Sequence, residues 1–216
     1  MKLEIKELRK KYGKKTVLDG ANLTVQGGTC VGILGGNGSG KSTMLSILAG
    51  IIRADGGSIQ AVNGEDQAKI GYVPQGTPLL EELSAKDNLR MWYDSQTLAK
   101  ELESGVLKSL GVDTFLKVPV KKMSGGMKKR LSIGCAVSGN PDVLLMDEPT
   151  AALDIVCKDQ IYSYIREFRK KGGIILLTTH DVSEIEICDL CYVLKDGKLY
   201  EYHFDGDVHK LAQWIQ

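Results

Sequence analysis

The sequence lacks a hydrophobic run long enough to cross a membrane. A membrane-spanning helix needs about 18 or more consecutive apolar residues, and the 216-residue chain contains no such run. The first residues, Met1-Lys2-Leu3-Glu4, alternate apolar and charged side chains, unlike a secretory signal peptide. If the protein serves a membrane, we therefore expect another chain to cross it.

An excess of charge of one sign is missing as well. The 28 lysines and arginines nearly balance the 27 acidic residues, which leaves a formal net charge of +1. This balance gives no strong electrostatic field that would favour nucleic acid or acidic lipid as a partner. We therefore expect no nucleic-acid partner.

The cysteines are few and form no paired framework. Their number is odd, and all five lie scattered through apolar stretches, which is typical of buried thiols in a reducing cytosol. Cys188 and Cys191 make the one close pair, and neither a second pair nor a histidine cluster accompanies it to complete a zinc site. We favour packing over metal binding or redox chemistry for this pair.

What is present is enough apolar sequence, 43% of the residues, to build the core of one large α/β domain or two small ones. Apolar runs and alternation predict strands at Leu3–Leu8, Leu23–Val25, Cys30–Leu34, Ser58–Val62, Lys69–Val73, Val143–Met146, Ile174–Leu177 and Cys191–Leu194. We expect Ser58–Val62 and Lys69–Val73 to form a small antiparallel layer, because the turn-forming Asn63-Gly64 lies between them. The later strands alternate with helices, which predicts a parallel sheet covered on both faces.

Helical patterns fill most of the intervals between these strands. They are expected at Lys41–Ala49, Asn88–Tyr93, Leu98–Leu110 and Met127–Val137, on a segment with Ile161, Tyr164, Ile165 and Phe168 on one face, and from about Asp181. A capping box at Ser84–Asp87 opens the middle group. We expect residues of about 76–139 to form an all-helical insertion, with the core and β layer at about 1–75 and 140–216.

A glycine-rich motif lies between a predicted buried strand and a predicted helix. Its sequence, Gly35-Gly36-Asn37-Gly38-Ser39-Gly40-Lys41-Ser42, matches G-x-x-x-x-G-K-[ST]. Glycines let several N–H groups point inward, the helix adds its positive end, and Lys41 places a charge against the terminal phosphates of a nucleotide. Ser42 offers a hydroxyl to Mg²⁺. The alternative, a plain glycine-rich turn, is disfavoured by the flanking strand and helix.

An acidic pair ends the predicted strand Val143–Met146. Strand ends in open α/β sheets are where ligands bind, so Asp147 is placed to reach Mg²⁺, directly or through water, as the partner of Ser42. Glu148 would face the attacking water, where a carboxylate accepts a proton or holds the water in line. Two acids solvated at a strand end would be the better interpretation if the phosphate-binding loop were absent.

With these two motifs in place, the chain resembles the nucleotide-binding domain of the ATP-binding cassette (ABC) family over nearly its whole length. Five further family motifs appear in the family's order. The resemblance implies that Tyr12 stacks on adenine, that Gln75 approaches Mg²⁺ and the attacking water, and that His180 contacts the γ-phosphate. Taken singly, these would be an exposed tyrosine, a turn glutamine and a histidine with a local hydrogen-bond partner.

The remaining two motifs imply a partner subunit. Ser124-Gly125-Gly126 resembles the family signature, whose helix N-terminus binds the γ-phosphate held by a second subunit. Met123 and Met127 replace the usual leucine and glutamine, and this variant resembles the ATPases of ABC-2-type exporters. Ala151-Ala152-Leu153-Asp154 resembles the D-loop at the subunit interface. A serine common at the position of Ala151 is absent, but Asp154 is retained.

The resemblance implies an α/β P-loop NTPase fold in one domain of residues 1–216: a mostly parallel sheet with helices on both faces, an antiparallel β layer and a helical insertion. ATP-binding residues would be Tyr12, Gly35, Gly36, Asn37, Gly38, Ser39, Gly40, Lys41, Ser42 and Thr43. Catalytic residues would be Gln75, Glu148 and His180, metal-binding residues Ser42, Gln75 and Asp147, and signature and interface residues Ser124, Gly125, Gly126 and Asp154.

The expected activity is hydrolysis of ATP with Mg²⁺ as cofactor. Two identical or different ATPase subunits would trap two ATP molecules and drive transport, with export favoured, through a separate integral-membrane subunit. The chain would lie in the cytoplasm, on the cytoplasmic face of the membrane. Leu79, Leu80, Leu83, Met91 and Trp92 are candidate docking residues, although we expect most of them to pack within the insertion instead.

Two other functions stay open at this point. A single compact cassette also suits a non-transport ABC ATPase, such as a soluble assembly or scaffold subunit. An inactive regulatory subunit is disfavoured because Lys41, Asp147, Glu148 and His180 are all present.

Overall fold

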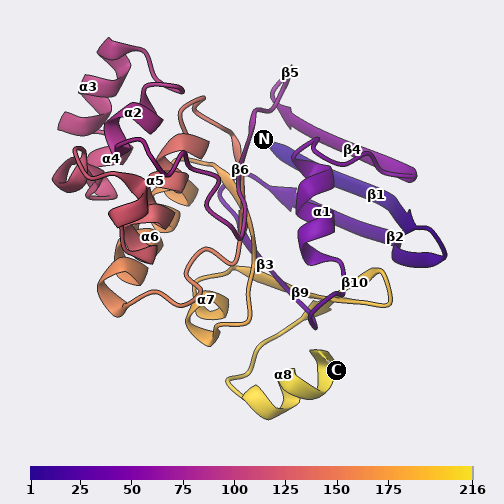
Figure 1. Ribbon diagram of the computed structural model, residues 1–216. Coiled ribbons are helices and arrows are strands. Elements are labelled where there is room, and N and C mark those ends of the chain that lie inside the picture. The colour runs from indigo at the N-terminus through magenta and orange to yellow at the C-terminus, as the bar shows by residue number, and fades with distance from the viewer. Residues whose placement is uncertain (216) are drawn as a thin grey trace.

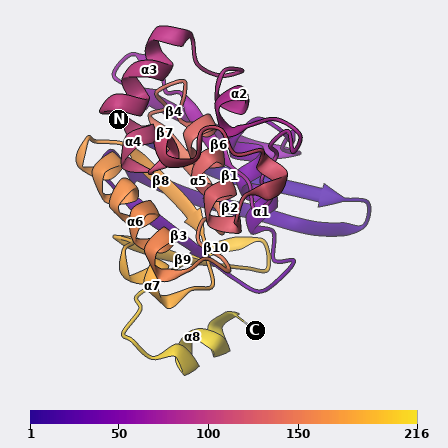
Figure 2. The same ribbon diagram turned by 60° about the vertical axis from the view of Figure 1, so that its left-hand side comes forward.

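Two β-sheets pack beside each other in the computed structural model, which describes residues 1–215 (Figures 1 and 2). The strands are β1 (Lys2–Tyr12), β2 (Lys15–Gln26), β3 (Cys30–Leu34), β4 (Gly56–Asn63), β5 (Asp66–Gln67), β6 (Ile70–Val73), β7 (Val143–Asp147), β8 (Ile174–Thr178), β9 (Leu190–Lys195) and β10 (Lys198–Tyr202). One sheet has the order β2-β1-β4-β5 and the other β10-β9-β3-β8-β7-β6.

The six-stranded sheet carries the predicted parallel core. Strands β9, β3, β8, β7 and β6 run parallel, and β10 joins β9 as an antiparallel hairpin at one edge. Strands β3, β7 and β8 are buried along their whole length. Such burial on both faces explains why these segments read as continuous apolar runs.

Helices cover the two faces of this sheet. The helices are α1 (Lys41–Leu48), α2 (Ala85–Leu89), α3 (Ser95–Glu103), α4 (Val106–Ser109), α5 (Gly125–Ala136), α6 (Ile155–Lys170), α7 (Val182–Glu186) and α8 (Val208–Ile215), with 3₁₀ turns at Val112–Phe115 and Val120–Lys122. Met44 and Leu45 of α1 pack on one face with Leu145 of β7. Leu131 of α5 and Ile161 of α6 belong to the core on the opposite face. Figure 1 shows α2, α3, α4 and α5 gathered on one side of the molecule, away from the antiparallel sheet.

One predicted strand lies in a different sheet from the one expected. Ile70–Val73 is β6, which pairs in parallel with β7 and so belongs to the central sheet, not to the antiparallel layer. The Asn63-Gly64 turn does form a hairpin, but its second strand is only Asp66–Gln67. The expectation was wrong because a turn signal fixes the direction of the next residues and not the sheet that later ones join.

The helices of about residues 76–139, the helical block, also differ in their bounds from those that the sequence predicts. The predicted helix Leu98–Leu110 is broken into α3 and α4 at Ser104-Gly105, where the carboxylate of Glu101 accepts the backbone N–H of Val106 at 2.7 Å. The predicted helix Asn88–Tyr93 is the end of α2 and the turn after it. Ser84 caps α2 as expected, accepting from the N–H of Asp87. Strand β10 and helix α8 were not predicted.

Within residues 1–215, no helix is both long and apolar enough to span a bilayer.

Glycine 57 provides a test of the antiparallel sheet. Its φ is 89°, and an added Cβ would meet the carbonyl oxygens of Glu7 and Lys6 on β1. At Gly64, φ is 67° but nothing lies within 4 Å of an added Cβ. We expect Gly57→Ala to lower the free energy of unfolding by about 2–4 kcal/mol, from backbone strain plus overpacking, and the control Gly64→Ala by about 1 kcal/mol. Urea unfolding monitored by circular dichroism measures both; equal losses would contradict the close approach at Gly57.

Candidate nucleotide site

The glycine-rich loop joins β3 to α1 and turns too sharply for side chains at several positions. Gly35 has φ 151°, and a Cβ there would lie 2.7 Å from the carbonyl oxygen of Leu194 and 2.8 Å from Ser39 Oγ. Gly40 has φ 110° and begins α1 without a side-chain cap. The first amides of α1 therefore remain free of a competing side-chain acceptor, as a helix N-terminus that binds an anion requires.

Lys41 is folded back onto this loop. The side chain is buried, and Nζ donates to the carbonyl oxygens of Gly35 at 2.7 Å and Gly36 at 3.2 Å. Burial lowers the pKa of Lys41, and the carboxylates of Glu148 and Asp147 oppose that shift. The loop thus concentrates positive potential where a phosphate would lie.

The acidic pair stands at the adjacent end of β7. Asp147 is buried and pairs in register with Thr178 of β8, whose hydroxyl donates to Asp147 Oδ1 at 2.5 Å. The next residue, Glu148, has φ 47°, a conformation that non-glycine residues seldom adopt. Its backbone N–H donates to the carbonyl and hydroxyl oxygens of Thr178, so the tight turn is held from β8. The two carboxylates have different partners: Asp147 accepts from the hydroxyl of Thr178, whereas Glu148 accepts from the side chain of Gln75.

Gln75 and His180 meet at Glu148. Gln75 Nε2 donates to one oxygen of Glu148 at 2.8 Å, and His180 Nε2 lies 3.7 Å from the other. Burial lowers the pKa of His180, the charge of Lys41 lowers it further, and Glu148 acts in the opposite direction. The direction of this shift favours the neutral imidazole. A hollow of about 450 Å³ opens beside these residues, lined by Glu148, Ala151, Thr179, His180, Asp181, Val182 and Glu184.

Tyr12 lies at the end of β1, in the hairpin to β2. The residue is 48% exposed, and Lys10 Nζ lies 5.4 Å from the centroid of its ring. Strand β2 runs against the phosphate loop, since a Cβ on Gly40 would lie 2.7 Å from Val17 Cγ1. An exposed ring on this hairpin suits stacking on a flat base.

The signature residues lie on a different element from the phosphate loop. Ser124 caps α5 by accepting from the N–H of Met127 at 3.2 Å, and α5 packs on the sheet face opposite to α1. Gly126 contacts Cys157 at the start of α6 so closely that no Cβ would fit. Asp154 is exposed and caps α6, accepting from the N–H of Cys157 at 2.9 Å. The structure therefore joins the signature to the D-loop and not to the chain's own phosphate loop.

Sequence reasoning missed three polar residues that position this site. Thr178 holds the acidic pair. Glu184 is buried on α7 and accepts hydrogen bonds from the N–H and hydroxyl of Thr150. Lys129 is buried on α5, and its ammonium donates hydrogen bonds to the backbone carbonyls of Pro74 and Gln75. Their contacts depend on how distant strands and helices pack, which local sequence patterns do not show.

The five cysteines are free thiols. Cys30 Sγ lies 3.8 Å from Cys188 Sγ, and a Cβ on Gly32 would meet the sulfurs of Cys188 and Cys191 at 3.1 and 3.4 Å. The three cysteines thus pack around a glycine of β3. Across the described residues 1–215, no group of three or more His, Cys, Asp or Glu side chains is placed to hold a metal ion.

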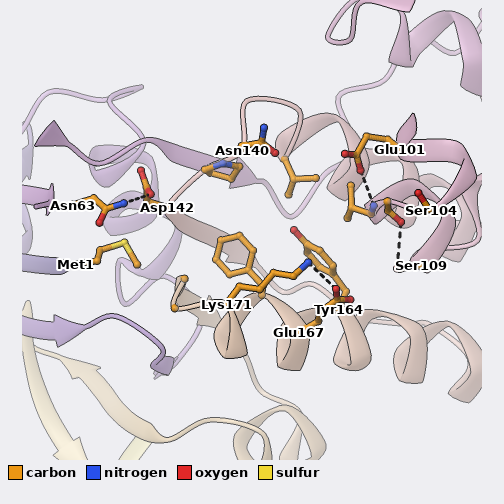
Figure 3. A pocket seen from close by; sticks show the side chains of 17 residues that line it. Met1, Asn63, Glu101, Ser104, Ser109, Asn140, Asp142, Tyr164, Glu167 and Lys171 are labelled. Atoms are coloured by element: carbon orange, nitrogen blue, oxygen red, sulfur yellow. Dashed lines mark hydrogen bonds and ion pairs between the residues drawn. The ribbon is translucent and has the colours of Figure 1, made fainter. Parts of the chain in front are cut away.

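A second cavity, of about 520 Å³, contains none of the predicted site residues. Figure 3 shows it between the α3–α4 break, α6 and the residues near Asn63. Its charged groups are already engaged: Asp142 accepts from Asn63 Nδ2 at 2.7 Å, and Lys171 pairs with Glu167 at 2.8 Å. The predicted catalytic residues therefore lie outside this cavity, at the strand ends around Glu148.

This geometry, a phosphate loop with a buried lysine beside an acidic pair at a parallel strand end, defines a P-loop nucleoside triphosphatase. Residues 18–151 match the family described as ABC transporter. The chain belongs to this ABC transporter family.

Curated relatives carry the names of ATP-binding proteins. The lantibiotic transport ATP-binding protein SrtF of Streptococcus pyogenes is 34% identical over 210 residues, which cover 94% of this chain and 92% of that protein. The linearmycin resistance ATP-binding protein LnrL of Bacillus subtilis is 34% identical, covering 91% and 67%. The Nod factor export ATP-binding protein I of Ralstonia nicotianae is 35% identical, covering 91% and 65%, so the chain spans about two thirds of these two relatives.

Solved cassettes share the fold. A nucleotide-free ATP-binding cassette from an ABC transporter superposes with a TM-score of 0.85 at 23% identity, covering 99% of this chain and 96% of the other. A dimeric cassette in a post-hydrolysis state, bound to ADP and Pi, superposes with a TM-score of 0.81 at 28% identity, covering 95% and 100%. The chain is an ATP-binding and ATP-hydrolysing subunit of this family.

Glu184 gives the site a measurable dependence on pH. Burial raises the pKa of its carboxyl, and the hydrogen bonds from Thr150 and Thr179 oppose that shift. A raised pKa in the folded state means that the stabilising contribution is complete at low pH and is lost as pH rises through the folded-state value. We expect Glu184→Gln, which keeps a carbonyl acceptor, to gain thermal stability relative to the wild type between pH 5 and pH 8. The exposed Glu186→Gln on the same helix is the control; parallel pH profiles for all three proteins would contradict the prediction.

Proposed function

We propose that the chain is one of a pair of ATPase subunits that close on two ATP molecules and drive export through a separate membrane subunit. The observation that carries this proposal is the convergence of Gln75 and His180 on Glu148, beside the phosphate loop and its buried Lys41. Residues from three separate loops meet there, as in-line attack of water on a γ-phosphate requires.

In the proposed reaction, Glu148 holds the attacking water in line and accepts its proton. The amide of Gln75 fixes one Glu148 oxygen, which leaves the other to face the water. Neutral His180 donates from its ring N–H to the γ-phosphate. Lys41 exchanges the carbonyls of its loop for phosphate oxygens, which offsets the charge that develops there.

The residues at this edge fit a magnesium ion. Ser42 is exposed in the first turn of α1, and Asp147 keeps a second carboxylate oxygen beyond the one bound by Thr178. Hydroxyl, carboxylate and amide oxygens are the donors that Mg²⁺ prefers, so Ser42, Asp147 and Gln75 would hold it. Within the part of the chain that the structure describes, Ser39 Oγ is buried and has no hydrogen-bond partner. Buried hydroxyls usually have one, so the phosphate loop lacks one hydrogen-bonding group. Bound there, the ion would supply positive charge against the phosphates of the nucleotide.

A second ATPase subunit would complete the site. Because α5 and α1 pack on opposite faces of the sheet, Ser124, Gly125 and Gly126 would serve the nucleotide of a partner, with Asp154 at the interface. The likeness to a dimeric cassette bound to ADP and Pi supports this arrangement. The partner is a second copy of this chain or a different ATPase subunit.

The membrane subunit would dock on the helical block of about residues 76–139, which we propose to be a subdomain of one domain spanning residues 1–216. Leu80, Leu83, Met91 and Trp92 are all exposed there, whereas Leu79 packs against the core. Large exposed apolar side chains close together favour a protein interface. This patch favours a membrane subunit as the partner. The name of one relative, a Nod factor export ATP-binding protein, favours export, with the chain on the cytoplasmic face of the membrane.

Substitution of Glu148 tests the two-subunit cycle. We expect Glu148→Gln to lower the rate of ATP hydrolysis at least about 100-fold, because an amide cannot accept the proton, and to form ATP-dependent dimers measurable by light scattering. Wild-type hydrolysis should rise more than linearly with protein concentration. The exposed Glu186→Gln should hydrolyse ATP as the wild type does. Linear activity, with no dimer of the variant, would contradict pairing of two copies of this chain.

Substitution of Trp92 tests the docking surface. Trp92 is 62% exposed, so we expect Trp92→Glu to fold and to hydrolyse ATP normally but to lose co-purification with a polytopic membrane protein. Tyr200→Glu, on the far edge strand β10 and 41% exposed, is the matched control. Co-purification of the wild type with soluble partners alone would favour an assembly or scaffold subunit instead.

A further inference from the structure

A buried lysine joins the signature helix to the glutamine loop. Lys129 lies on α5, five residues after Ser124, and is 5% exposed. Its Nζ donates to the carbonyl oxygens of Pro74 at 3.1 Å and Gln75 at 3.0 Å. These two carbonyls lie immediately after β6, where the chain leaves the central sheet for the helical block.

The position is a costly one for a lysine. Burial lowers the pKa of Lys129, and the carboxylates of Asp147, Glu184 and Glu148 oppose that shift. An apolar side chain of similar length would fill the same space without the loss of hydration that a buried ammonium suffers. What an apolar side chain cannot do is hold two backbone carbonyls, so the lysine is best explained by those two hydrogen bonds.

The bonds lead directly to the reacting carboxylate. Lys129 fixes the backbone of Gln75, and the side-chain amide of the same residue donates to Glu148 at 2.8 Å. Lys129 itself lies on α5, and the first residues of this helix are the signature. Because a helix rises about 1.5 Å per residue, Lys129 lies little more than one turn from the signature on the same hydrogen-bonded helix, so a shift of the signature also moves the ammonium.

We propose that Lys129 is a positioning residue that fastens the glutamine loop to the signature helix, so that the place of this helix sets the place of Gln75 against Glu148. The inference rests on the proposed roles of Glu148 and Gln75 in hydrolysis and adds a residue to them. Contact of the signature with a partner's nucleotide would then align the water-directing groups of the subunit that carries this signature.

Lys129→Met tests the proposal, because it keeps the length of the side chain and removes the donor. We expect kcat for ATP hydrolysis to fall about 10- to 100-fold, the range that a misplacement of about 1 Å produces, while KM for ATP stays within about twofold. Lys129→Arg, which keeps the charge and the donors, should recover most of the lost kcat. Lys108→Met, an exposed lysine of the same helical block, is the matched control.

A cycle with Gln75→Ala separates positioning from general support of the fold. If Lys129 acts through Gln75, Lys129→Met should lower kcat no further in a Gln75→Ala background. An equal loss of kcat in both backgrounds, or no loss in either, overturns the proposal. Lys129→Gln, whose side chain is one bond shorter than lysine and so cannot hold both carbonyls at hydrogen-bond distance, takes the place of Lys129→Met in the same cycle if thermal melting shows that the methionine variant does not fold.

The same assay distinguishes failure of this inference from failure of the proposed function. Wild-type kcat in Glu148→Gln would overturn the hydrolytic roles at this site and the inference with them. Loss of activity in Glu148→Gln and Gln75→Ala, beside additive effects of Lys129→Met, would overturn the inference alone.

Discussion

Parallel pairing of β3, β8 and β7 is the constraint on which the site depends. Their carboxyl ends share one edge of the sheet, so the phosphate loop after Leu34, the acidic pair at Asp147 and the segment after Thr178 emerge side by side although they lie far apart in the sequence. The register is fixed by apolar side chains that alternate between two buried cores, and a slip of one residue would move each side chain into the opposite core. Stability of the sheet and geometry of the site therefore rest on the same pairing.

Electrostatic balance at this edge explains why the charged residues tolerate burial. Lys41 is held by two carbonyls and faces Asp147 and Glu148, and Lys129 is held in the same manner behind them. Two ammonium groups near two carboxylates, each with hydrogen-bond partners, avoid the penalty of an isolated buried charge. The left-handed backbone of Glu148 adds local strain that the neighbouring strand β8 restrains.

Local patterns were predictable from the sequence, and contacts between distant elements were not. The phosphate loop was predictable because glycine positions, Lys41 and the flanking strand and helix lie within one short segment. The place of β6 was missed because its partner, β7, lies beyond the whole helical block. The break at Gly105 depends on the side chain of Glu101, and Lys129 gave no signal because its partners are backbone carbonyls near Gln75.

The positions of α1 and α5 on opposite faces of the sheet would couple ATP hydrolysis to movement of the two proposed subunits. A chain that places its phosphate loop on α1 and its signature on α5 cannot use both on one nucleotide, since the sheet stands between them. One nucleotide would contact both a phosphate loop and a signature only where two subunits meet. Loss of its γ-phosphate would remove the contact that joins the two subunits. Gln75 and Lys129 connect the edge that carries Glu148 to the helical block that bears Met91 and Trp92. In the proposed pair, the step that opens the two subunits would therefore also displace the surface proposed for a membrane partner.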